Sequence, residues 1–318
     1  MEIDMVVFKR IAAALAAALI ALPAAAHATV SGVTPLVSTQ WLEDNIGNEN
    51  LLVLDIRSEM AKSGKDDYLK GHIPGALWSP YPGFWRTSRD GVVGVVPSIS
   101  TLEAELSNLG VDEDKTVVIV PAGTSHTEFG AAARIYWTFK YLGHESVAIL
   151  DGGHKAWVAE ERTLEAGNVQ PQSALFVAEP NQDLIISTDE VAGRINTSTI
   201  LIDGRPEEQF LGAKKHDKAT RFGHIPGAQH LDNASFYDAQ ANRLKPLSEI
   251  AALLPANLRE TEEDIVSYCN TGHWAATNWF VLREVLGKDN VTLYDDSIVG
   301  WSQRADLPVA APQVPAAN

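Results

Sequence analysis

Short runs of apolar, β-branched residues alternate with longer amphipathic stretches along most of the chain. Such runs are typical of strands buried on both faces of a parallel sheet, and the stretches between them have the length of crossover helices. Strands are predicted at 51–55, 117–120, 147–150, 200–203, 265–268 and 291–294. Helices are predicted near 100–109, 128–142, 187–196, 248–254 and 275–286. The pattern therefore predicts an α/β protein built from βαβ units.

This pattern occurs twice. The segment Leu51–Arg57 (LLVLDIR) corresponds to Thr199–Arg205 (TILIDGR), and Gly71–Ala76 (GHIPGA) returns letter for letter as Gly223–Ala228. The second copy has four more residues between these two motifs. A third motif closes each copy: DGGHKAW from Asp151 and DDSIVGW from Asp295. The repetition predicts two tandem domains of the same fold.

Composition places the domain boundaries. Residues 161–183 are rich in Pro, Gln and Asn and are predicted to be a linker between a first domain at 36–160 and a second at 184–308. Residues 309–318 are mostly Pro and Ala and are predicted to form a disordered tail.

The N-terminus has the features of an export signal. Lys9 and Arg10 precede an apolar stretch at 11–22, and small residues follow up to Ala28. This order is typical of a signal peptide cleaved near Ala28, which predicts a periplasmic or secreted protein. An uncleaved membrane anchor is the alternative, although the apolar stretch is short for a membrane span. No other part of the sequence is apolar enough to cross a bilayer, so no stable membrane insertion is expected.

Charge and cysteine content narrow the function. The formal net charge of −16 argues against nucleic acid and anionic membrane surfaces as partners. The single cysteine, Cys269, cannot form an internal disulfide, and one Cys with scattered His residues does not supply the ligands of a structural zinc site. An unpaired thiol in an exported protein is most easily explained if the sulfur is used in a reaction.

Cys269 lies between the predicted strand at 265–268 and the predicted helix at 275–286. A thiol in this position faces unpaired backbone N–H groups and the positive end of the helix dipole, and both favour the reactive thiolate. Gly272 is expected to supply the positive φ that a tight loop needs. The alternative is that Cys269 is a small buried apolar residue, which is the commoner role of a free cysteine.

The Asp-x-Arg motif, GHIPGA, the Cys loop and the closing Asp-Gly-Gly-x-x-x-Trp motif, in this order, resemble the rhodanese-like sulfurtransferases of the tandem two-domain type. The resemblance covers nearly the whole chain after the signal peptide. It implies two domains, each a parallel five-stranded sheet with helices on both faces, and a catalytic cysteine in the second domain. It implies no metal or organic cofactor.

The first domain is predicted to be non-catalytic, because counting back from its closing motif reaches Ser125 and the residue after its strand is Pro121. This domain could still supply a wall of the substrate cleft. The candidates for the wall are aromatic: Trp78, Tyr81, Phe84 and Trp85, for which core packing is the alternative.

The loop Cys269–Trp274 has the length found in the sulfurtransferase branch. Related phosphatases have an Arg six positions after Cys, where this chain has Ala275, and this argues against phosphate chemistry. The residues predicted to bind substrate are those of the loop and two cations: Asn270, Thr271, Gly272, His273, Trp274, Lys218 and Arg221.

The side chains that select the donor differ from the best-known branches. Thr271 occupies a position that is often basic in thiosulfate enzymes, and Gln209 one that is often Arg in tandem enzymes. An anion clamp could come instead from the cluster Lys214, Lys215, Lys218 and Arg221, for which a solvated charged loop is the alternative. Asp203, Arg205 and His224 are expected to be structural.

The resemblance implies transfer of sulfane sulfur from thiosulfate to cyanide or a thiol through a persulfide on Cys269. The donor could instead be 3-mercaptopyruvate. A third hypothesis is a non-catalytic periplasmic persulfide carrier or sulfur-binding partner of another periplasmic enzyme. The expected partners are a small-molecule sulfur donor and acceptor, and a protein could also be the acceptor.

Overall fold

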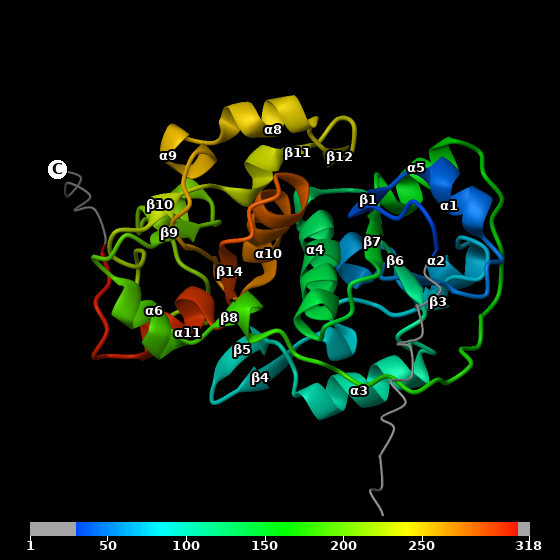
Figure 1. Cartoon of the computed structure of the whole chain (residues 1–318), viewed down its shortest axis with the longest axis horizontal. Helices are drawn as coiled ribbons and strands as arrows, with labels where there is room; N and C mark the ends of the chain where they lie inside the picture. Colours follow the sequence, from blue (N-terminus) through cyan, green and yellow to red (C-terminus); the bar gives the residue numbers. More distant parts are fainter. Residues whose placement is uncertain (1–29, 311–318) are drawn as a thin grey trace, which may run out of the picture.

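The computed structural model describes residues 30–310 of the 318-residue chain. The predicted signal peptide, residues 1–28, lies outside the described residues, and so do residues 311–318 of the predicted tail. The described residues form two α/β halves that lie side by side, the first half at the right of Figure 1 and the second at the left.

Each half contains a five-stranded sheet in which every strand pairing is parallel. The first sheet has the order β1-β7-β6-β2-β3 and consists of β1 (Leu36–Val37), β2 (Leu51–Asp55), β3 (Leu77–Trp78), β6 (Thr116–Val120) and β7 (Val147–Leu150). The second has the order β10-β9-β13-β14-β8 and consists of β8 (Ile185–Ile186), β9 (Ile200–Asp203), β10 (Gln229–His230), β13 (Ile265–Tyr268) and β14 (Val291–Tyr294). Matched through the repeat, the two orders are the same, which confirms the predicted fold.

Helices flank both sheets. Those of the first half are α1 (Thr39–Asn45), α2 (Lys65–Lys70), α3 (Ile99–Asn108), α4 (His126–Tyr141) and α5 (Gly153–Ala159). Those of the second are α6 (Thr188–Arg194), α7 (Glu207–Phe210), α8 (Leu247–Leu253), α9 (Ala256–Arg259), α10 (His273–Phe280) and α11 (Ser297–Gln303). The helix predicted at 275–286 begins two residues earlier, and after Phe280 it continues as a π-helical turn at Val281–Val285.

The two halves share one hydrophobic core. Helices α4 and α10 pack against each other at the centre of the molecule, and α4 is buried almost all round because it lies between its own sheet and α10. The ring of Phe280 meets Tyr136 and Phe129 edge-on, with centroids 4.9 and 5.7 Å apart. Apolar burial across this boundary stabilises the two domains as a unit.

Two hairpins cross the domain boundary in opposite directions. The hairpin β4 (Thr87–Arg89)–β5 (Val92–Val95) reaches the second domain, where Gln303 donates to the carbonyl of Gly91 over 3.1 Å. The hairpin β11 (Tyr237–Asp238)–β12 (Arg243–Leu244) reaches the first, where Lys155 donates to the Asn242 side chain over 3.2 Å. Each domain therefore covers part of the other.

The segment between the domains runs without helix or regular strand from residue 160 to 181. Ala310, which composition placed in a disordered tail, instead exchanges two backbone hydrogen bonds with His224.

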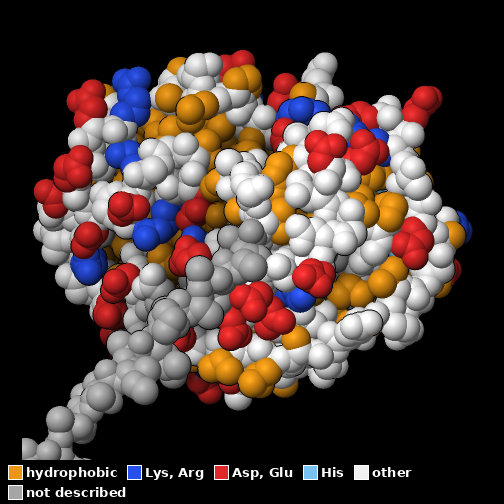
Figure 2. Space-filling model, turned by 45° about the vertical axis from the view of Figure 1, so that its right-hand side comes forward, with side chains coloured by type: hydrophobic (Ala, Val, Ile, Leu, Met, Phe, Trp, Pro, Cys, Tyr) orange, Lys and Arg blue, Asp and Glu red, His pale blue; other side chains and the backbone are white. Residues whose placement is uncertain are grey.

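Acidic side chains are spread across the face shown in Figure 2 and are interspersed with basic and apolar ones. None of the helices within residues 30–310 has the length and apolar character that a membrane span requires.

Candidate active site

Cys269 is the first residue after the central strand β13, and the loop Cys269–Gly272 leads directly into α10. The residue is 1% exposed and lines a cavity of about 240 Å³ between the two domains. The second domain contributes Cys269, Asn270, Thr271, His273, Trp274 and His216 to the lining. The first domain contributes Met60, Tyr81, Pro82, Arg86 and Thr127. The thiol lies between a strand and a helix, as predicted, and the first domain forms the opposite wall of the cavity.

The sheet register identifies the counterpart of Cys269 in the first domain. Tyr268 pairs with Asp203 and Val120 pairs with Asp55, and the two aspartates are equivalent in the repeat. Pro121 therefore stands where the second domain has Cys269, and the first-domain loop, which ends at Ser125, is one residue longer. The position directly after the strand therefore identified the counterpart of Cys269 correctly as Pro121. Counting back from the closing motif, which reached Ser125, did not.

All four backbone carbonyls of the loop Cys269–Gly272 accept hydrogen bonds from other parts of the protein. Those of Cys269 and Asn270 each accept a backbone N–H over 3.0 Å, from Ile298 and Val299 at the start of α11. Two first-domain arginines hold the others: Arg86 binds the carbonyl of Thr271, and Arg134 that of Gly272 over 3.3 Å.

The anchored carbonyls determine where the loop amides point. In a trans peptide the N–H lies opposite the C=O, so the amides of Asn270, Thr271 and His273 are turned toward the inside of the loop. These N–H groups and the N-terminus of α10 form a cradle for an anion or a thiolate.

Ser297 fixes the two remaining amides. Its hydroxyl accepts from the backbone N–H of Cys269 over 3.1 Å and of Gly272 over 3.0 Å, and it donates to the carbonyl of Tyr294. Ser297 has a φ of 51°, and its counterpart Gly153 has a φ of 60°. The second closing motif thus keeps the positive φ at this position although serine replaces glycine, whereas Asp296, with a φ of −63°, does not keep the positive φ of Gly152. The serine side chain ties the motif to the Cys loop.

Gly272 meets the expectation from the sequence. Its φ is +74°, and a Cβ at this position would lie 2.4 Å from Nη1 of Arg134. Both the backbone conformation and the close approach of a buried guanidinium therefore require glycine.

Asp296, which interrupts the second Asp-Gly-Gly motif, lies at the domain boundary. It forms an ion pair with Arg89 of the β4–β5 hairpin over 3.0 Å and accepts a hydrogen bond from Thr188. The departure from the motif is thus explained by an interdomain contact.

The first domain holds His273 on both sides. Nε2 of His273 lies 3.0 Å from the carbonyl of Thr127, which can only accept, and Nδ1 lies 2.8 Å from the hydroxyl of Tyr81. The neutral Nε2–H tautomer satisfies both contacts, with Tyr81 as donor. Burial, reinforced by the positive charge of Arg86, lowers the pKa of His273 to about 3. His273 therefore stays neutral at physiological pH, and both of its ring nitrogens are used between the domains.

Only part of the predicted aromatic cluster lines the cavity. Tyr81 lines the cavity, while Trp85 is fully buried in the core. Trp274 lines the cavity too, and its indole N–H donates to the hydroxyl of Thr127 over 3.3 Å.

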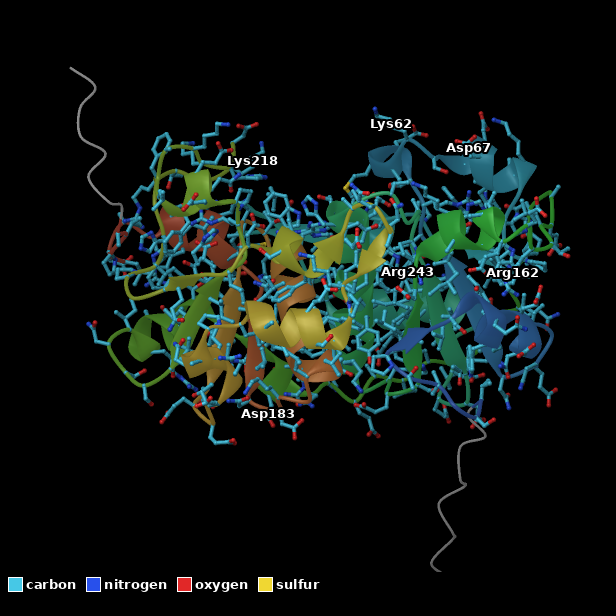
Figure 3. All side chains as sticks on the ribbon, turned by 90° about the horizontal axis from the view of Figure 1, so that it is seen from above. Lys62, Asp67, Arg162, Asp183, Lys218 and Arg243 are labelled. Atoms are coloured by element: carbon cyan, nitrogen blue, oxygen red, sulfur yellow. The ribbon has the colours of Figure 1, made fainter. Side chains whose placement is uncertain are left out.

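The two predicted cations do not line the cavity. Lys218 is exposed at the surface of the second domain (Figure 3), and its backbone N–H donates to His216 over 3.2 Å. The guanidinium of Arg221 donates to four backbone carbonyls between residues 301 and 307 and so anchors the C-terminal segment. Lys214 pairs with Glu208, and Lys215 donates to the carbonyl of Ala219. The residue between Lys214 and Arg221 that does line the cavity is His216.

No pattern in the sequence pointed to Arg86, the arginine in the cavity wall. It belongs to the first domain, far from Cys269 along the chain, and only the packing of the domains brings the two together.

The residues that were expected to be structural form contacts within the second domain and do not line the cavity. Arg205 pairs with Asp203 and donates to the carbonyl of Gly223, and His224 contacts the carbonyl of Phe210.

The first-domain loop leads into α4, where Glu128 is only 3% exposed and its side chain lacks a cationic partner among the described residues. Burial raises the pKa of Glu128 to about 7, against the lowering effect of the nearby Ala122 backbone. In the unfolded chain the carboxyl ionises near pH 4.5. The stability that Glu128 provides as a neutral group is therefore complete below pH 4.5 and is lost as the pH rises through about 7.

Glu128→Gln should thus become progressively more stable than the wild type between pH 5 and pH 8. The amide preserves the shape of the side chain but cannot ionise, and the difference at pH 8 should be on the order of 2 kcal/mol. Urea unfolding of both proteins across this pH range measures the difference directly. A difference that does not change with pH would show that folding does not raise the pKa of Glu128.

Comparison with known proteins identifies the family. The model of the rhodanese-like domain matches residues 38–160 and 187–304. A Mycolicibacterium smegmatis protein named "Putative thiosulfate sulfurtransferase" is 32% identical over 285 residues, covering 87% of this chain and 96% of the relative. The 3-mercaptopyruvate sulfurtransferase of Escherichia coli K12 is 30% identical over 285 residues, covering 87% and 98%.

Solved structures agree. The crystal structure of the 3-mercaptopyruvate sulfotransferase SseA from Escherichia coli has a TM-score of 0.70 at 25% identity, and the match covers 83% of this chain and 99% of that one. Tum1 of Saccharomyces cerevisiae, at 22% identity and a TM-score of 0.71, shares the fold over 87% of this chain and 98% of its own. The chain belongs to the rhodanese family and contains two tandem rhodanese-like domains.

Proposed function

We propose that this protein is a sulfurtransferase that moves sulfane sulfur from thiosulfate to a thiophilic acceptor, cyanide or a thiol, through a persulfide on Cys269. The observation that carries the proposal is the position of Cys269. The only thiol of the chain lies at the N-terminus of α10, in a loop with inward-turned amides, on the wall of an interdomain cavity. The family and the names of the relatives support the sulfurtransferase class.

The chemistry takes two steps at one sulfur. The Cys269 thiolate attacks the outer sulfur of thiosulfate, the S–S bond of the donor breaks, and sulfite leaves with the bonding electron pair. The acceptor then attacks the outer sulfur of the persulfide and releases the Cys269 thiolate. Because the anion persists through both steps, the loop amides and the dipole of α10 stabilise every charged form of the sulfur. Ping-pong kinetics follow from the covalent intermediate.

3-Mercaptopyruvate is the second candidate donor. It is supported by the name of the Escherichia coli relative and by a cavity wall that includes Met60, Pro82 and Trp274, which suits a donor with a carbon skeleton. We also propose that the protein acts in the periplasm or outside the cell, on the basis of the signal-like residues 1–28.

A donor panel tests the proposal. Thiocyanate formation from cyanide should be faster with thiosulfate than with 3-mercaptopyruvate, by about tenfold in kcat/KM, which is a difference of about 1.4 kcal/mol in transition-state stabilisation. The reverse order would make 3-mercaptopyruvate the donor. A persulfide that forms on Cys269 but turns over with neither cyanide nor a small thiol would identify a sulfur carrier.

A further inference from the structure

We propose that Arg86, a residue of the first domain, recognises the anionic end of the sulfur donor in the Cys269 cavity. The group it would bind is a sulfonate, as in thiosulfate, or a carboxylate, as in a mercapto acid. The assignment deepens the proposed function and rests on it for the identity of the donor.

Arg86 is held rigidly at the cavity wall. Its Nε donates to the carbonyl of Gly94 over 2.8 Å, and Nη2 donates to the carbonyl of Thr271 in the Cys loop. The guanidinium carbon lies 5.9 Å from the centre of the Tyr81 ring. A guanidinium has five N–H donors in a fixed plane, so donors remain after these two bonds. An arginine restrained in this way loses little side-chain entropy when it binds an anion.

Arg86 is also the only arginine or lysine among the residues that line the cavity. His273 is neutral there. Burial lowers the pKa of His216; Asp217 acts against this, while Arg86 and two lysines outside the lining, Lys218 and Lys215, act in the same direction. Arg134 lies behind the loop, where Asp295 offsets its charge. The permanent positive charge of the cavity therefore comes from the first domain.

Among the described residues, the second domain contributes no arginine or lysine to the cavity lining. The side-chain amide of Asn270 donates to Gln209 over 2.8 Å, which makes a neutral pair beside Cys269. The molecule as a whole carries a formal charge of −16, and its field opposes the approach of an anion. A local positive charge at the cavity is what an anionic donor needs to reach a thiolate that is itself negative.

Alkylation of Cys269 tests the charge without requiring turnover. Iodoacetate and iodoacetamide both transfer a carbon to the thiolate and release iodide, but only iodoacetate is an anion. In Arg86→Gln, the alkylation rate with iodoacetate should fall about tenfold relative to the rate with iodoacetamide, the loss expected for one charge-assisted contact. Arg86→Lys should retain most of the preference, because it retains the charge.

Lys70→Gln is the matched control, since it removes the same charge from an exposed side chain that does not line the cavity. It should leave the ratio of the two rates within about twofold, as surface charges are screened. Equal loss of both rates in Arg86→Gln would show that Arg86 only shapes the loop and would overturn the proposal. An unchanged ratio in Arg86→Gln, or an equal fall in Lys70→Gln, would also overturn it.

Steady-state kinetics then identify the anion. A rise in KM of Arg86→Gln for thiosulfate alone assigns the sulfonate, a rise for 3-mercaptopyruvate alone assigns the carboxylate, and a rise for both shows a shared site. An unchanged KM for both donors contradicts the assignment. If the wild type turns over neither donor, the proposed function fails, but the alkylation ratio still decides the role of Arg86.

Discussion

Cys269→Ser should reduce thiocyanate formation to the non-enzymatic rate, a loss of about three orders of magnitude or more. The chain has no second thiol, and Pro121 stands in the equivalent place of the first domain, so no other residue can form the persulfide. The hydroxyl of serine is a far poorer nucleophile at neutral pH. Thiocyanate release with cyanide and each donor measures the loss.

Mass spectrometry supplies the complementary measurement. Wild type incubated with the donor should gain about 32 Da, one sulfur atom, on the peptide that contains Cys269. The serine variant should gain nothing and should unfold at the same urea concentration as the wild type, within the small effect of an isosteric change. Substantial turnover by the folded variant would remove Cys269 from the mechanism.

Arg134→Met should destabilise the protein by about 3–5 kcal/mol, because it leaves the buried carboxylate of Asp295 without its cation. Arg134 is fully buried on α4 and pairs with Asp295 beside the Cys loop. The other oxygen of Asp295 accepts the backbone N–H of Val96 over 2.7 Å, which is not enough to stabilise a buried charge. Urea unfolding measures the loss of free energy.

The same substitution should slow sulfur transfer, since the carbonyl of Gly272 loses the donor that orients the loop. Adding Asp295→Asn should restore much of the stability, because neither buried charge remains, but should leave kcat reduced by about tenfold. Arg162→Met is the control: Arg162 pairs with the half-exposed Glu43 and Glu160 at the surface of the same domain, and its loss should have a much smaller effect. Equal destabilisation by the two variants would contradict a special role for the buried pair.

The central strands were predictable because each is a run of consecutive apolar residues, which can be recognised within a few positions of the sequence. The outer strands β1, β3, β8 and β10 were not predicted, because each has only two residues and a pair carries no periodicity. Their pairing is determined by the neighbouring strand. The hairpins that cross between the domains were not predicted either, because their partners lie far along the chain. Gln303 is 212 residues from Gly91, and Lys155 is 87 residues from Asn242.

Local patterns let the sequence alone determine the repeat, the fold of each copy and the position of Cys269 between a strand and a helix. A strand, a glycine-containing loop and a helix N-terminus are adjacent in the chain, so the environment of the thiol follows from a few residues. The substrate cleft depends on which surfaces of two domains meet, and only the tertiary structure decided that. It placed Arg86, Tyr81 and Thr127 against the Cys loop and placed Lys218 and Arg221 elsewhere. A charge on a surface segment cannot be assigned to a cavity until the packing of the apolar faces, here α4 against α10, determines where the domains join.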